Sequence, residues 1–174
     1  MARVDAGMIC VVIAVQGDEA RLGPALAALV PAAVDGLVKQ VLLVDDGADE
    51  DVRLLADDMG ADLAGPDMKA ACDGARAEWL MILPQPLRLQ RGWEADVEAL
   101  LAKGPGWARL SVRAEGWLFA RRNLRGEGLL VERALYDAVG GWGDRPGAEG
   151  AQALLRALRR RSGRGPARLA VLTR

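Results

Sequence analysis

Hydrophobic positions in the first half of the chain follow two patterns, continuous apolar runs and runs with helical spacing. Continuous apolar runs occur at 8–15, 41–44 and 79–83. Such runs are typical of strands that helices cover on both faces, as in a parallel sheet. Between them, apolar residues recur at helical spacing over 19–29 and about 50–59, which predicts two helices.

Proline and glycine mark where these elements stop. Pro31 is expected to end the first helix, and Gly60 to close the second. Pro84 ends the third apolar run, and Pro86 excludes a continuing central strand because proline has no N–H for the ladder. Weaker patterns in this half predict a short strand at 61–64 and helices at 67–78 and 93–101.

The best internal break is Gly104-Pro105-Gly106, which separates residues 1–103 from 107–174. We expect both halves to belong to a single domain, because a chain of 174 residues fits one domain better than two. Beyond the break, the pattern predicts strands at 108–113, 128–131 and 169–172, the last of them at a sheet edge, and helices at 133–139 and 148–161.

Three buried strands joined by helices predict an open α/β sheet, in which ligands bind at the carboxyl ends of the strands. That rule gathers residues 14–18, 45–47 and 84–87 along one edge of the sheet. We call this edge the rim.

Composition excludes several chemistries. The chain has no His, which removes a Ser-His-Asp triad, an imidazole base and a His-ligated zinc. Its two Cys, Cys10 and Cys72, cannot build a disulfide framework, and we expect two small buried residues in a reducing cytosol. The longest apolar run has eight residues, too short to cross a bilayer, so we expect a cytoplasmic protein without an integral membrane segment.

Charge is divided unevenly along the chain. Residues 1–100 carry 8 Lys and Arg against 18 Asp and Glu, whereas residues 101–174 carry 15 against 6. A basic tail for nucleic acid or anionic lipid is one interpretation; an acidic and a basic half that neutralise each other within one fold is the other. The second is favoured, because only Arg164, Arg168 and Arg174 follow the last helical pattern. We therefore expect no nucleic-acid partner.

Several segments occur in an order that resembles the family 2 glycosyltransferases, which have the GT-A nucleotide-diphosphosugar transferase fold. The 107–113 segment is similar to a small bacterial subgroup of them, and Glu149 stands in an Arg-rich helix as in the family's acidic helix. The other matching segments are Ile-Ala-Val-Gln-Gly-Asp-Glu at 13–19, Val-Asp-Asp-Gly-Ala-Asp-Glu at 44–50, Ala-Arg-Ala-Glu-Trp-Leu-Met-Ile-Leu at 75–83 and Leu-Val-Glu-Arg-Ala-Leu-Tyr-Asp-Ala-Val-Gly-Gly-Trp at 130–142.

The resemblance implies a three-layer α/β/α, Rossmann-like GT-A domain whose mostly parallel sheet has an antiparallel C-terminal portion. Residues 1–103 would form its nucleotide-binding half and 107–174 its acceptor-side half. It also implies transfer of a sugar from a nucleotide-diphosphosugar, with a UDP-sugar as first choice, to an unknown acceptor. The family holds Mg²⁺ or Mn²⁺ on the diphosphate.

By the same resemblance, Asp45 or Asp46 would accept hydrogen bonds from the base and ribose. Alternatively, Asp46-Gly47 only forms a turn and Asp49 or Glu50 caps the next helix. The full set of expected site residues is Ala14, Gln16, Asp18, Asp45 and Asp46 for the nucleotide, Glu149 or Glu127 as general base, and Arg121, Arg122 and Arg125 for the diphosphate, although these arginines also suit a solvated turn.

The chain departs from the family where chemistry matters most. Pro86 stands in place of the metal-binding aspartate, and proline has no side-chain oxygen for a divalent ion. Gln85 offers only a neutral oxygen. Gly150 replaces the expected Asp of the acidic helix, and Ala14 and Gly17 replace the Pro and Asn of the first loop. The sequence therefore predicts a lost metal site.

Three functions stay open at this point. The first is a working glycosyltransferase that uses arginines in place of the metal, and the second is a GT-A domain that binds a nucleotide or a partner protein without turnover. The third is a receiver-like signalling domain, because Val-Leu-Leu-Val-Asp-Asp at 41–46 resembles the first strand of a response regulator. Pro84 stands at the position of the phospho-acceptor and has no carboxylate, which argues against the receiver-like function.

Overall fold

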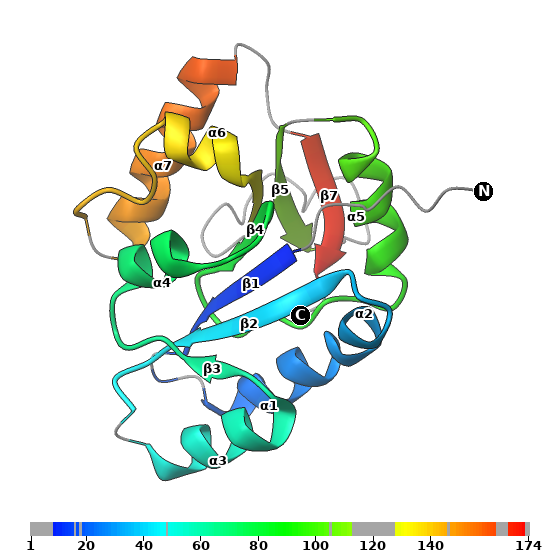
Figure 1. The fold of residues 1–174 in the computed structure, drawn as a ribbon, viewed down its shortest axis with the longest axis vertical. Helices are drawn as coiled ribbons and strands as arrows, with labels where there is room; N and C mark the ends of the chain where they lie inside the picture. Colours follow the sequence, from blue (N-terminus) through cyan, green and yellow to red (C-terminus); the bar gives the residue numbers. More distant parts are fainter. Residues whose placement is uncertain are drawn as a thin grey trace.

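The computed structural model describes residues 9–15, 17, 19–47, 49–104, 106–112, 128–145, 147–162 and 167–172. Within this part of the chain, one seven-stranded sheet lies between two layers of helices (Figure 1). The strands are β1 (Ile9–Ala14), β2 (Val38–Val44), β3 (Asp62–Leu63), β4 (Trp79–Leu83), β5 (Trp107–Val112), β6 (Leu129–Glu132) and β7 (Ala167–Leu172). The helices are α1 (Glu19–Ala27), α2 (Val30–Val34), α3 (Glu50–Met59), α4 (Met68–Gly74), α5 (Trp93–Leu101), α6 (Arg133–Ala138) and α7 (Gly147–Ser162).

The strand order is β3-β2-β1-β4-β6-β5-β7. Strands β3, β2, β1 and β4 run parallel, β6 is antiparallel to both of its neighbours, and β7 is parallel to β5 at the sheet edge. The predicted fold class, mostly parallel with an antiparallel portion in the second half, is confirmed. The receiver-like interpretation is not supported, because flavodoxin-like sheets of that kind have the order 2-1-3-4-5.

Alternating side chains of the central strand β1 pack into two separate hydrophobic cores. Ile9, Val11 and Ile13 pack in one core with side chains from α1, α2, α3 and α5. Cys10 and Val12 pack on the opposite face with side chains from α4, α6 and α7. Because β1 is covered on both faces, its apolar residues form a continuous run in the sequence.

Most predicted elements are present, and several of their boundaries differ from the prediction. Pro31 does not end the first helix region, because α1 ends at Ala27 and Pro31 lies in the first turn of α2. A helix accepts proline there, since the missing N–H would have no partner in the helix. The helix expected over 67–78 ends at Gly74, where Ala75 is extended. Gly60 closes α3 in the left-handed conformation, as predicted.

Both cysteines are buried free thiols, as predicted from the sequence. Cys10 lies in β1 and Cys72 in α4, within the same core. Burial raises the pKa of each thiol to about 12, so both stay neutral at physiological pH. Among the described helices, none combines the length and apolar character that crossing a bilayer requires.

Tyr136 in α6 ties together segments that are distant in sequence. Its hydroxyl donates to Asp73 Oδ1 of α4 at 3.1 Å and accepts from the backbone N–H of Trp142 at 3.0 Å. Arg133, one turn earlier, donates to the carbonyl of Ala75 and lies with its guanidinium 5.6 Å from the centre of the Tyr136 ring. Burial raises the pKa of Tyr136 above its usual range, so the hydroxyl remains a neutral donor.

Trp142 then sets the start of α7. Its side chain is 4% exposed, and its indole packs directly on Gly150 in the first turn of that helix. A Cβ at position 150 would overlap Trp142 Nε1 and the backbone oxygen of Arg145. Position 150 therefore accepts only glycine without a shift of the indole or the helix.

We predict that Gly150→Ala destabilises the protein by about 1–3 kcal/mol, because the new methyl group overpacks against the indole and backbone. Gly23→Ala is the matched control, since Gly23 lies inside α1 and a Cβ there would meet only Leu55 Cδ2 at 3.9 Å. That control should gain up to about 1 kcal/mol from helix propensity. Urea unfolding measures both, and equal stabilities for the two variants would contradict the prediction.

Candidate functional site

The carboxyl ends of β1, β2 and β4 meet along one edge of the sheet. Ala14 is the register partner of Val44, and Ile13 is the partner of Leu83. The residues that follow these strands therefore leave the sheet side by side, which is the rim expected from the sequence. A rim of this kind is where open α/β sheets bind their ligands.

Asp45 forms the turn that follows β2. Its backbone N–H donates to the carbonyl of Gly65 at 3.1 Å, and its Oδ2 accepts from the N–H of Gly47 at 2.8 Å. Gly47 has a φ of +74°, which glycine adopts without strain. One carboxylate oxygen of Asp45 thus holds the turn, a role that the sequence analysis had considered for Asp46. Asp46 follows as an exposed residue.

Asp49 has a purely local role. Its Oδ1 accepts from the backbone N–H groups of Asp51 at 2.8 Å and Val52 at 3.4 Å, which caps α3. The cap satisfies donors that the first turn of a helix leaves without partners. Of the three aspartates after β2, Asp45 and Asp46 therefore remain the candidates for contact with a ligand.

At the end of β1, the described residues offer a ligand peptide groups rather than side chains. Ala14 is 8% exposed, and its methyl group packs in the core beneath α4, α6 and α7. Any contribution of Ala14 to a ligand would come from its peptide groups. Gly17 has a φ of +76° and is exposed. The expected nucleotide contacts Gln16 and Asp18 lie outside the described residues.

The β4 side does not fit a divalent metal. Pro86 and Leu87 are buried, and Gln85 supplies only a neutral amide oxygen. Asp45 and Asp46 follow β2, which is two strands from β4 and hence about 10 Å away at the usual strand spacing. Mg²⁺ and its analogues need several hard oxygens within about 2.0–2.6 Å. Across the described ranges, no three Asp, Glu, Cys or His side chains surround a common point.

Helix α7 lies on one face of the sheet and carries a candidate base. Glu149, a candidate base, is exposed in the first turn of this helix, which packs through Leu154 and Leu158 on the sheet face that also carries Ala14. The packing of Gly150 against Trp142 explains why no second carboxylate follows Glu149.

The remaining expected residues, Arg121, Arg122, Arg125 and Glu127, lie outside the described residues. The described residues on either side of their segment are Val112 at the end of β5 and Gly128 before β6. Gly128 lies against the end of β4, where a Cβ would come within 2.7 Å of Leu83 Cδ2. The chain on both sides of these candidates is therefore at the rim end of the sheet.

Arg109 in β5 is a functional candidate that the sequence analysis missed. It is 6% exposed, and charged side chains are seldom buried without a specific role or partner. Through the register of the sheet, Arg109 pairs with Leu129, which pairs with Ile82 near the end of β4. Both partners belong to the core beneath α4, α6 and α7, so Arg109 lies on the same sheet face as Ala14. The sequence feature that could have identified Arg109 is that it is the one charged residue in the stretch 107–112.

Comparison with known proteins gives matches only at the level of structure. No protein-family model and no curated protein matches the chain. The structure resembles glucosyl-3-phosphoglycerate synthase from Mycobacterium tuberculosis in complex with Mn²⁺, UDP and phosphoglyceric acid, with a TM-score of 0.62, 18% identity, and coverage of 93% of this chain and 68% of that one. It also resembles the mannosyltransferase PcManGT from Pyrobaculum calidifontis in complex with GDP-Man and Mn²⁺, with a TM-score of 0.67, 13% identity, and coverage of 97% and 56%.

Identities this low establish the fold and leave activity to be argued from the residues. The strand order and both structural neighbours agree with the resemblance that the sequence motifs predicted. The chain has a GT-A-like nucleotide-sugar transferase fold.

Proposed function

We propose that this chain binds a nucleotide-diphosphosugar at the rim and transfers its sugar without a resident divalent metal. The observation that carries the proposal is the register that aligns the ends of β1, β2 and β4 and puts Asp45 and Asp46 beside the loop after Ala14. Carboxylates there suit the N–H groups of a base and the hydroxyls of a ribose. A UDP-sugar is the first donor to test, since UDP is bound by one of the similar structures.

The transfer that fits this site inverts the anomeric centre. Glu149, or Glu127 as the second candidate, would take the proton of the acceptor hydroxyl as general base. The acceptor oxygen would then form a bond to the anomeric carbon while the bond to the diphosphate breaks, and the electron pair would leave with the diphosphate. The exposed position of Glu149 leaves it accessible to an acceptor.

The negative charge of the leaving diphosphate needs a cation. Because the end of β4 does not fit a metal, arginines would neutralise the charge of the diphosphate. Their planar guanidinium groups bind two phosphate oxygens at once. Arg121, Arg122 and Arg125 were expected from the sequence, and Arg109 adds a buried cation on the same face of the sheet.

A second candidate function is binding without turnover. The buried Pro86 and the glycine at position 150 favour it, since each occupies a place where a family member would carry a carboxylate. The chain would then act as a nucleotide- or protein-binding domain. The cytoplasmic location stays a prediction from sequence.

Nucleotide binding should be independent of metal. We expect micromolar affinity for UDP or UDP-glucose by titration calorimetry, changed less than about threefold between Mn²⁺ and EDTA. Asp45→Asn combined with Asp46→Ala should weaken binding at least about tenfold, because the amide keeps the turn and removes the charge. Asp35→Ala at the opposite end of β2 is the control. An absence of binding to UDP, GDP and CDP at millimolar concentration, or a strict need for Mn²⁺, would refute the proposal.

Turnover separates the two candidate functions. Hydrolysis of UDP-glucose, with water as acceptor, should fall about 10²- to 10⁴-fold in Glu149→Gln while the affinity for UDP-glucose is retained. Glu98→Gln, at an exposed position of α5 in the other helix layer, should be silent. A wild-type protein that binds UDP-glucose and never hydrolyses or transfers the sugar would establish the second candidate.

We predict that Arg109 binds the diphosphate and does not contact the nucleoside. We expect Arg109→Leu to weaken UDP binding at least about tenfold and uridine binding by less than about twofold, with Arg109→Lys in between. Arg159→Leu, on the exposed side of α7, is the charge-matched control. Equal losses for UDP and uridine, measured by calorimetry on variants with cooperative thermal unfolding, would show that Arg109 only supports the fold.

A further inference from the structure

The exposed side of α3 carries an apolar side chain within a ring of carboxylates. Leu54 is 56% exposed, although the neighbouring positions Val52 and Ala56 are buried in the core. Residues three and four positions apart are neighbours on a helix surface. At those distances from Leu54 stand four exposed acids, Glu50, Asp51, Asp57 and Asp58. We call Leu54 and these four residues the acidic face.

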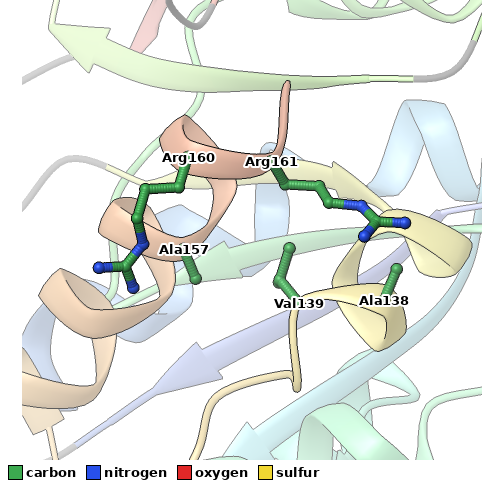
Figure 2. Close-up of a pocket in the computed structure, with 5 residues that line it drawn as sticks. All are labelled: Ala138, Val139, Ala157, Arg160 and Arg161. Atoms are coloured by element: carbon green, nitrogen blue, oxygen red, sulfur yellow. The ribbon is translucent and has the colours of Figure 1, made fainter. Parts of the chain in front are cut away.

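A shallow, open hollow with the opposite character lies between the end of α6 and the last turns of α7. It has a volume of about 320 Å³ and is lined by Ala138, Val139, Ala157, Arg160 and Arg161. Figure 2 shows the two arginine side chains extending to opposite sides, with the small apolar side chains between them. Both arginines are exposed. We call this site the basic hollow.

The proposed sugar transfer has no use for either surface. Arg160 is eleven residues after Glu149 on the same helix, which separates the hollow from the candidate base by about 16 Å at 1.5 Å per residue. The acidic face points away from the core that α3 shares with β1 and β2. The acidic face and the basic hollow are therefore available for contact with another molecule.

The two surfaces cannot meet within one chain. Helix α3 packs on one face of the sheet through Val52 and Ala56, and α7 packs on the other face through Leu154 and Leu158. Figure 1 shows α3 at the bottom of the molecule and α7 at its upper left. Contact between them requires two molecules.

We infer that the acidic face of one copy docks into the basic hollow of a second copy. Leu54 enters between Ala138, Val139 and Ala157, where its side chain leaves water for apolar contacts. The surrounding carboxylates then reach Arg160 and Arg161, whose charges have the complementary sign. The division of charge along the chain, 18 acids against 8 bases before residue 101 and 6 against 15 after it, favours this head-to-tail arrangement.

This contact joins different surfaces on the two copies. Each complex therefore keeps one unused acidic face and one unused basic hollow, so assembly continues into a ring or an open chain. The inference does not depend on the proposed sugar transfer, and either one can fail without the other.

Sedimentation velocity tests the inference on the full chain. The mean mass should rise with protein concentration at about 0.1 M salt and return to that of the monomer at about 1 M salt, where the Debye length falls from about 10 Å to about 3 Å. A monomer at every concentration in low salt would overturn the inference.

Charge reversals identify the surfaces. Arg160→Glu with Arg161→Glu destroys the basic hollow, and Asp51→Lys with Asp58→Lys destroys the acidic face. Each double variant alone should associate at least about tenfold more weakly. A 1:1 mixture should associate more strongly than either variant alone, because the first variant keeps an intact acidic face and the second an intact hollow, and the reversed charges on the two variants are complementary to each other. A mixture that stays monomeric would overturn the inference.

Matched controls separate the contact from general charge effects. Arg156→Glu with Arg159→Glu changes the charge of α7 equally outside the hollow and should leave association intact. Leu54→Ala should weaken association, whereas Val34→Ala, at a valine that is 80% exposed on α2, should not. If the hollow variant fails to fold, Leu54→Ala and the acidic-face variant decide the outcome. Wild-type association that none of these changes affects would place the contact elsewhere.

Discussion

The rest of this structure depends on the burial of β1 between two parallel neighbours and two layers of helices. Every residue from Ile9 to Ile13 is fully buried, and the strand pairs in register with β2 on one side and β4 on the other. A one-residue slip would exchange the two sets of side chains between two different cores, so packing holds the register firmly. The rim follows from this register, because the last residues of β1 pair with the last residues of β2 and β4. The carboxylates after β2 are near the loop after β1 for the same reason.

The second half of the chain is positioned by buried polar contacts as well as by apolar packing. Tyr136 connects α4 to the glycine-rich segment before α7, and Arg133 connects α6 to the end of α4. A buried donor or acceptor that loses its partner costs about 1–3 kcal/mol, so these contacts hold the geometry of that segment. The Gly-Gly-Trp segment thus has a structural role: it places the Trp142 indole on Gly150, next to Glu149 in the first turn of α7.

In the described residues at the rim, the anionic and cationic groups lie on different strands. Asp45 and Asp46 follow β2, and the buried side chains of Pro86 and Leu87 follow β4. Among the described residues on this face of the sheet, the cation nearest the rim by register is Arg109 on β5. In a partly desolvated site a guanidinium supplies a fixed positive charge and paired donors, which is the electrostatic part of what a divalent ion does for a diphosphate. The charge of the molecular surface is divided in a similar way, with acids around Leu54 on α3 and arginines at the end of α7.

The sequence by itself determined the strands of the parallel half, most helices and the rim, because strand burial, glycine caps and helical spacing are local signals. The GT-A-like fold was predicted by the resemblance of several motifs to the family 2 glycosyltransferases. The sequence also showed that position 86 at the end of β4 has no carboxylate for a metal, since the proline side chain carries no oxygen. It could not show that Pro31 begins a helix, that Asp45 holds the turn while Asp49 caps α3, or that Arg109 is buried. Nor could it show that an indole fills the place of a side chain at position 150. Those facts depend on which distant segments come into contact, and only tertiary packing decides that.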